Sequence, residues 1–128
     1  MEPIYRRELY LSRIRPFVKH ADLIKVITGV RRCGKSTVMR MVADELAEHG
    51  VPERNLVFLD LDSRGYRKVR TADALDELIE RVSAPEGMTY LFIDEVQNVE
   101  GFEEVLNAWR GEGTHSIFIT GSNSYLLS

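Results

Sequence analysis

The sequence predicts an α/β fold: a mainly parallel sheet with helices on both faces, in three layers. Apolar runs of strand length alternate with segments of helical spacing, in the order β-α-β-α-β-α-β. This alternation favours parallel strands joined by crossover helices, and right-handed crossovers then restrict the topology. With 128 residues and 44% hydrophobic composition, the chain has the size of one globular domain, residues 1–128.

The first half of the chain supplies two strands and two helices. We expect a helix over residues 4–19 and a strand over residues 23–28, which is mostly apolar and β-branched. A second helix over residues 35–49 carries apolar side chains near helical spacing, and Gly50 is its stop signal. The apolar run over residues 55–61 then predicts the second strand.

The second half repeats the pattern. Thr71 is a suitable N-cap for a helix that runs to about Val82. Residues 89–94 and 115–120 are apolar runs that predict the third and fourth strands. Between them, four large apolar residues recur at i, i+3, i+4 and i+7 and predict an amphipathic helix: Phe102, Val105, Leu106 and Trp109.

Residues 29–36, between the first strand and the following helix, read Gly-Val-Arg-Arg-Cys-Gly-Lys-Ser. This is the phosphate-binding loop pattern without departures, in the strand–loop–helix context that the motif requires. Glycines allow a tight turn whose amides face phosphate oxygens, and the helix directs its positive end at the same anion. Lys35 is expected to reach the β- and γ-phosphates, and Ser36 to offer its hydroxyl to Mg²⁺. The expected nucleotide contacts are Gly29, Val30, Arg31, Arg32, Cys33, Gly34, Lys35, Ser36 and Thr37.

Two adjacent carboxylates end the third predicted strand, where ligands of open α/β sheets bind. Asp94 is expected to hold Mg²⁺ directly or through water, and Glu95 to activate an attacking water as general base. The neighbouring Glu favours water-activating ATPases over GTPase switches, and the chain contains no Asn-Lys-x-Asp guanine signature.

The fourth predicted strand ends in Gly121-Ser122-Asn123-Ser124. Gly121 allows a turn after which Asn123 or Ser122 can present a polar group to the γ-phosphate or to the attacking water. An ordinary strand-to-turn exit has the same composition.

Charge is unevenly distributed: residues 1–40 carry +7 and residues 41–128 carry −10. The basic segment surrounds the phosphate-loop pattern and suits an anionic ligand. A second basic cluster lies on a loop that we expect to be exposed. Its side chains could contact a partner or nucleic acid, or they could simply be solvated. It consists of Arg64, Arg67, Lys68 and Arg70.

The sequence contains no apolar run of 18 residues, so no membrane span is expected. The N-terminus lacks the apolar segment of a signal peptide, and the single cysteine, Cys33, excludes an intrachain disulfide. These features are typical of a cytoplasmic protein.

Three motifs in order make the chain resemble a prokaryotic branch of the AAA-type ATPase superfamily. They are Ile27–Thr37, Phe92–Val99 and Thr120–Ser128. The resemblance covers nearly the whole chain and implies a sheet ordered 5-1-4-3-2. It also implies that Asn123, rather than Ser122, is the sensor, and that Gln97 helps to orient the site.

The sequence departs from this family by ending just after the sensor strand. Compared with what the resemblance implies, the fifth strand, the second sensor, the arginine finger and the C-terminal domain of uncertain function are expected to be missing from this chain. The chain is therefore expected to be the N-terminal part of a longer protein, with the phosphate-loop strand at a sheet edge. Another chain or the C-terminal domain is the expected partner.

These features predict ATP binding and Mg²⁺-dependent ATP hydrolysis, with Lys35, Glu95 and Asn123 as catalytic residues and Ser36 and Asp94 as metal ligands. The alternative is a nucleotide-dependent regulatory or assembly switch with little hydrolysis. A small-molecule kinase is disfavoured because no Arg-rich lid is present in the sequence.

Overall fold

The computed structural model describes residues 23–27 and 35–121. The elements follow one another in the order β1 (Ile24–Ile27), α2 (Lys35–Glu48), η2 (Glu53–Asn55), β2 (Leu56–Asp60), α3 (Ala72–Val82), β3 (Thr89–Asp94), η3 (Val96–Asn98), α4 (Phe102–Glu112) and β4 (His115–Thr120). The strand and helix boundaries agree with the sequence prediction to within a residue or two. The predicted helix over residues 4–19 lies outside the described residues.

The four strands form one parallel sheet in the order β1-β4-β3-β2. This confirms the 1-4-3-2 part of the predicted order. Within the described ranges the sheet has no fifth strand, and β1 lies at one edge. The pairing brings together segments far apart in the chain: Ile27 lies opposite Thr120, and Asp60 lies opposite Asp94.

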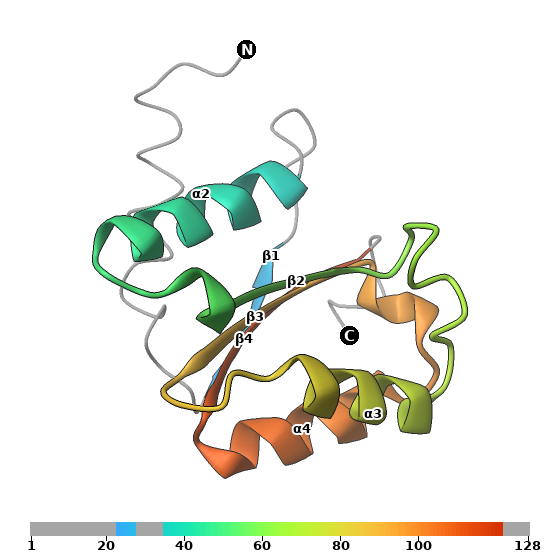
Figure 1. Ribbon diagram of the computed structural model, residues 1–128. Coiled ribbons are helices and arrows are strands. Elements are labelled where there is room, and N and C mark those ends of the chain that lie inside the picture. Colours follow the sequence, from blue (N-terminus) through green and yellow to red (C-terminus); the bar gives the residue numbers. More distant parts are fainter. Residues whose placement is uncertain (1–22, 28–34, 122–128) are drawn as a thin grey trace.

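Helices cover both faces of the sheet, as predicted (Figure 1). On one face lies α2, whose buried residues include Val38, Met41, Val42 and Leu46, the positions with helical spacing in the sequence. Gly50 adopts the left-handed conformation (φ 97°) just after α2 and so ends the helix as expected. Against α2 the sheet presents three stacked rings, from Phe58, Phe92 and Phe118, with adjacent centroids 4.8 Å apart.

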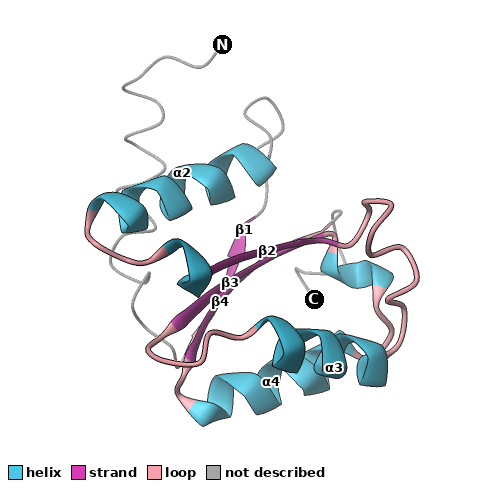
Figure 2. Ribbon diagram, viewed as in Figure 1, coloured by secondary structure: helices cyan, strands magenta, loops and turns pink. Residues whose placement is uncertain are grey.

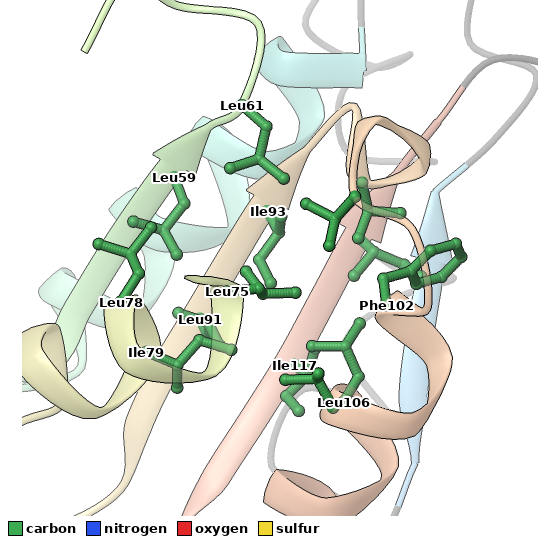
Figure 3. Close-up of a cluster of buried hydrophobic side chains, with 14 residues drawn as sticks. Leu59, Leu61, Leu75, Leu78, Ile79, Leu91, Ile93, Phe102, Leu106 and Ile117 are labelled. Carbon is green, nitrogen blue, oxygen red and sulfur yellow. The ribbon is translucent and has the colours of Figure 1, made fainter. Parts of the chain in front are cut away.

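The other face is covered by α3 and α4. Thr71 caps α3 as predicted, because its hydroxyl accepts the Ala74 N–H at 3.2 Å. Figure 3 shows how side chains from both helices meet those of three strands in a cluster that includes Leu59, Leu75, Leu78, Ile79, Leu91, Ile93, Phe102, Leu106 and Ile117. Strands β3 and β4 therefore contribute side chains to both cores, which is why they read as continuous apolar runs.

The second strand is shorter than predicted. Asn55 belongs to η2, and Leu61 follows the strand in a turn, although its N–H still donates to the Asp94 carbonyl at 3.1 Å. In the described part of the chain, no helix has the length and apolar character that crossing a membrane would require.

Candidate functional site

The carboxyl ends of the four strands lie at the same end of the sheet because all strands are parallel. At this end, Ile27 of β1 lies beside Thr120 of β4, and Thr120 in turn lies beside Asp94 of β3. The phosphate-loop pattern begins at Gly29, two residues after Ile27, and α2 begins at Lys35. About 10 Å therefore separates the end of β1 from the end of β3, since neighbouring strands are about 4.8 Å apart.

Asp94 closes a strand whose other residues are all buried, and it is itself half-buried. Its carboxylate Oδ1 accepts a hydrogen bond from the hydroxyl of Thr120, a fully buried residue on the neighbouring strand. The same hydroxyl oxygen accepts the backbone N–H of Glu95 at 3.1 Å. One threonine side chain thus contacts both members of the acidic pair.

Glu95 turns the chain out of the sheet. It has φ 61° and ψ 49°, and among the described residues it is the one non-glycine residue with positive φ. This conformation costs about 1–2 kcal/mol for a residue with a Cβ. The next residues hold it in place: Val96 is fully buried in the core, and Asn98 N–H donates to the Glu95 carbonyl at 3.1 Å.

The Glu95 side chain is half-buried and is contacted by Gln97, whose Nε2 donates to Glu95 Oε1 at 2.7 Å. A carboxylate oxygen only accepts, so the Gln97 amide must present its nitrogen to Glu95. Its own Oε1 is buried and has no hydrogen-bond partner in the described structure. A buried acceptor without a partner is uncommon and needs an explanation, such as a water or ligand in the working state.

The loop after β2, residues 61–70, forms backbone hydrogen bonds with residues 94–100 at both of its ends. It begins with the Leu61–Asp94 hydrogen bond, and it ends where Glu100 N–H donates to the Arg70 carbonyl at 3.0 Å. Tyr66 and Val69 anchor the loop by packing on the core. In Figure 2 this loop and η3 lie at the same end of the sheet.

The basic cluster on this loop is exposed, as predicted from the sequence. It comprises Arg64, Arg67, Lys68 and Arg70.

A sequence profile described as an AAA domain matches residues 21–128. The chain belongs to the AAA family. This membership assigns the chain, at the level of the family, to the P-loop nucleotide-binding proteins.

Two relatives of this AAA domain have no assigned function. An uncharacterized protein of Haemophilus influenzae is 41% identical over 123 residues, which is 95% of this chain and 30% of the relative. An uncharacterized protein of Methanocaldococcus jannaschii is 32% identical over 106 residues, which is 82% of this chain and 22% of the relative. The chain thus spans less than a third of either relative. No solved structure matches the chain significantly.

The predicted site residues of this AAA domain fall into two groups. Asp94, Glu95 and Gln97 are brought together at the end of β3, and the backbone of α2 begins at Lys35 as expected. Thr37 is exposed in the first turn of α2. The remaining predicted residues lie outside the described part of the chain: Gly29 to Gly34, the side chains of Lys35 and Ser36, and the sensor candidates Ser122 and Asn123.

Sequence reasoning missed Thr120 as a site residue. The sequence places Thr120 at the last position of an apolar strand and at the start of the third motif, without a role in the site. A polar residue closing the buried run Ile117–Ile119 was the available signal, but its partner Asp94 lies 26 residues away in the sequence. Only the pairing of β3 with β4 brings the two side chains together.

Proposed function

We propose that this AAA domain binds ATP with Mg²⁺ and hydrolyses the terminal phosphate. In this proposal the phosphate loop and Thr37 surround the phosphates, with Lys35 on the β- and γ-phosphates. Ser36 and Asp94 hold Mg²⁺, Glu95 accepts a proton from the attacking water, and Asn123 senses the γ-phosphate.

The observation that carries this proposal is the arrangement of strand ends. One strand, β4, separates β1 from β3, and β1 and β3 run in the same direction. Strand β1 leads into the phosphate-loop pattern, and Asp94 and Glu95 lie at the carboxyl end of β3. In open α/β sheets the carboxyl end of the strands is where ligands bind. A triphosphate held between the loop and β3 can therefore reach both the helix α2 N-terminus and the acidic pair.

The residues present fit Mg²⁺ rather than a metal with a full protein cage. Mg²⁺ prefers oxygen ligands and is usually held by one or two carboxylates together with substrate phosphates and water. Within the described ranges no cluster of three or more His, Cys, Asp or Glu side chains could hold a metal ion. One oriented carboxylate, Asp94, plus the Ser36 hydroxyl supplies the donor set that such a site needs. When bound, the ion would neutralise phosphate charge.

The chemical step assigned to Glu95 is general-base catalysis. Its carboxylate takes one proton from water as the water oxygen bonds to the γ-phosphorus. The bond between that phosphorus and the bridging oxygen breaks, and the products are ADP and inorganic phosphate. The turn at Glu95 and the hydrogen bond from Gln97 restrict where this carboxylate can point.

Titration calorimetry with ATP and Mg²⁺ tests the proposal, with GTP and the Lys35→Ala variant beside it. We expect ATP to bind more tightly than GTP. Loss of Lys35 should weaken binding by at least about tenfold, since hydrogen bonds to charged groups contribute about 1.5–3 kcal/mol. Lys68→Ala, which changes an exposed lysine of the basic loop, is the matched control and should bind like the parent. Equal affinity in the parent and Lys35→Ala would refute the assignment.

A second candidate function is a nucleotide-dependent switch with little hydrolysis. The attachment of the loop after β2 to the Asp94–Glu100 segment favours it, because nucleotide contacts at Asp94 would be transmitted to an exposed surface. In that case ATP should change the oligomeric state or partner binding of the full-length protein, measured by light scattering. Unchanged mass with and without ATP would count against the switch.

A further inference from the structure

We propose that Thr120 is a positioning residue that orients both carboxylates of the site from the neighbouring strand. The inference rests on the proposed function and adds to it a residue that touches neither phosphate nor water in that scheme.

Thr120 is fully buried, and burying a hydroxyl without hydrogen bonds is unfavourable. Valine has almost the same shape and would fill the same place at the end of an apolar strand. The hydroxyl is therefore not needed for packing. Its two hydrogen bonds, to the Asp94 carboxylate and from the Glu95 amide, are what distinguish threonine here.

The direction of both hydrogen bonds is fixed. The Glu95 backbone N–H can only donate, so the Thr120 oxygen must accept from it at 3.1 Å. The single hydroxyl proton is then directed at Asp94 Oδ1, which accepts it. A hydrogen bond to a carboxylate is stronger than one between neutral groups, so it holds the Asp94 side chain in a defined orientation.

The second hydrogen bond acts on Glu95 through its backbone. Glu95 has the strained left-handed conformation, and its N–H is satisfied by a side chain instead of a strand carbonyl. Thr120 thereby supports the backbone turn at Glu95, on which the position of the Glu95 side chain depends. A displacement of either carboxylate by about 1 Å can cost about 10²-fold in rate.

The matched pair Thr120→Val and Thr120→Ser separates positioning from packing. Valine keeps the shape and removes both hydrogen bonds, whereas serine keeps the hydroxyl and loses a methyl group. We expect Thr120→Val to fold and to bind ATP without Mg²⁺ like the parent. It should lose the gain in affinity that Mg²⁺ provides, so its KM for Mg²⁺–ATP should rise, and its kcat should fall by about 10²-fold.

Thr120→Ser should retain kcat and the Mg²⁺ effect to within about threefold, although removing a buried methyl group lowers its stability. If the serine variant loses kcat as much as the valine variant, the methyl group matters and the positioning role is wrong. Parent-like kcat and Mg²⁺ dependence in a folded Thr120→Val would also overturn it.

A measurement that needs no nucleotide separates this inference from the proposed function. Hydrogen exchange of the Glu95 amide, followed by NMR in the free chain, should be about tenfold faster or more in Thr120→Val, for a lost hydrogen bond of about 1.4 kcal/mol. It should stay slow in Thr120→Ser. If the parent binds no ATP but this pattern holds, the proposed function fails while the Thr120–Glu95 bond stands. Equal exchange in parent and Thr120→Val refutes the inference itself.

Discussion

The strand pair β3–β4 carries buried polar groups at both of its ends, and the two ends use them differently. At the amino end, His115 and Thr89 are buried and bonded to neutral neighbours. His115 Nε2 pairs with the Ser83 hydroxyl at 2.7 Å, and Thr89 Oγ1 accepts the Ala84 N–H at 3.0 Å. Asn55, close by, donates to two loop carbonyls.

At the carboxyl end the polar groups are the carboxylates of Asp94 and Glu95, the second of which has the left-handed conformation, and the Thr120 hydroxyl that contacts both residues. A buried acceptor without a partner is found at both ends, in Asn55 Oδ1 and Gln97 Oε1, so that feature alone does not mark a site. Charge and backbone strain are what differ. The polar groups at the amino end thus stabilise the fold, whereas the carboxyl end keeps charged and strained groups that folding alone would not select.

The largest expected effect is on hydrolysis at the carboxyl end. Glu95→Gln removes the proposed base and should lower kcat by about 10²–10⁴-fold, while ATP binding stays within about twofold of the parent. Steady-state phosphate release and calorimetry measure the two quantities. Glu100→Gln, which alters an exposed carboxylate on the same segment, is the control and should keep parent activity. If Glu95→Gln hydrolyses ATP at the rate of the parent, Glu95 is not the base, and the two ends of the strand pair do not differ in function.

The next effect is on stability at the amino end. Asn55→Ala deprives the carbonyls of Glu86 and Met88 of donors that lie 2.9 Å away. The free energy of unfolding should fall by about 1–3 kcal/mol, measured by urea denaturation, with kcat unchanged in the folded fraction.

Asn107→Ala, on the exposed surface of α4, should alter the free energy of unfolding by less than about 0.5 kcal/mol. A drop in kcat for folded Asn55→Ala, or no loss of stability, would contradict the structural role of that end.

A smaller effect is expected at Gln97. Gln97→Met keeps the length of the side chain but removes the donor to Glu95, so kcat should fall by about tenfold, equivalent to about 1.4 kcal/mol. Stability should be unchanged or higher because the unpartnered Oε1 is also removed. Comparing phosphate release with thermal unfolding separates these outcomes, and a loss of stability without a loss of kcat would show that Gln97 belongs to the core.

The smallest expected effect concerns pH. Burial lowers the pKa of His115, and the nearby Glu112 opposes this only in part. The unfolded chain therefore binds a proton more readily than the folded one, so the free energy of unfolding should decrease as the pH falls below the ordinary His pKa of about 6.5. His115→Gln should show a flatter dependence in urea denaturation between pH 7.5 and 5.5. An identical slope in both proteins would exclude His115 as the source.

The strands and helices were predictable wherever the local sequence pattern and the packing in the folded protein favour the same element. The apolar runs at residues 89–94 and 115–120 became buried parallel strands, and Thr71 capped its helix. Asn55 was wrongly assigned to a strand because an apolar run follows it, whereas its side chain donates to carbonyls 31 and 33 residues away. Such a contact leaves no pattern in the local sequence.

By itself the sequence determined the fold class, the order of elements and the position of the acidic pair at a strand end, because periodicity and motif spacing are local properties. Only the tertiary structure decided that Asp94 receives a threonine hydroxyl, that Glu95 turns left-handed and that Gln97 contacts it. The reason is geometric. Parallel strands are connected by crossovers, so the chain must pass through helix α4 before β4 can run alongside β3. The carboxyl end of β4 then lies beside Asp94.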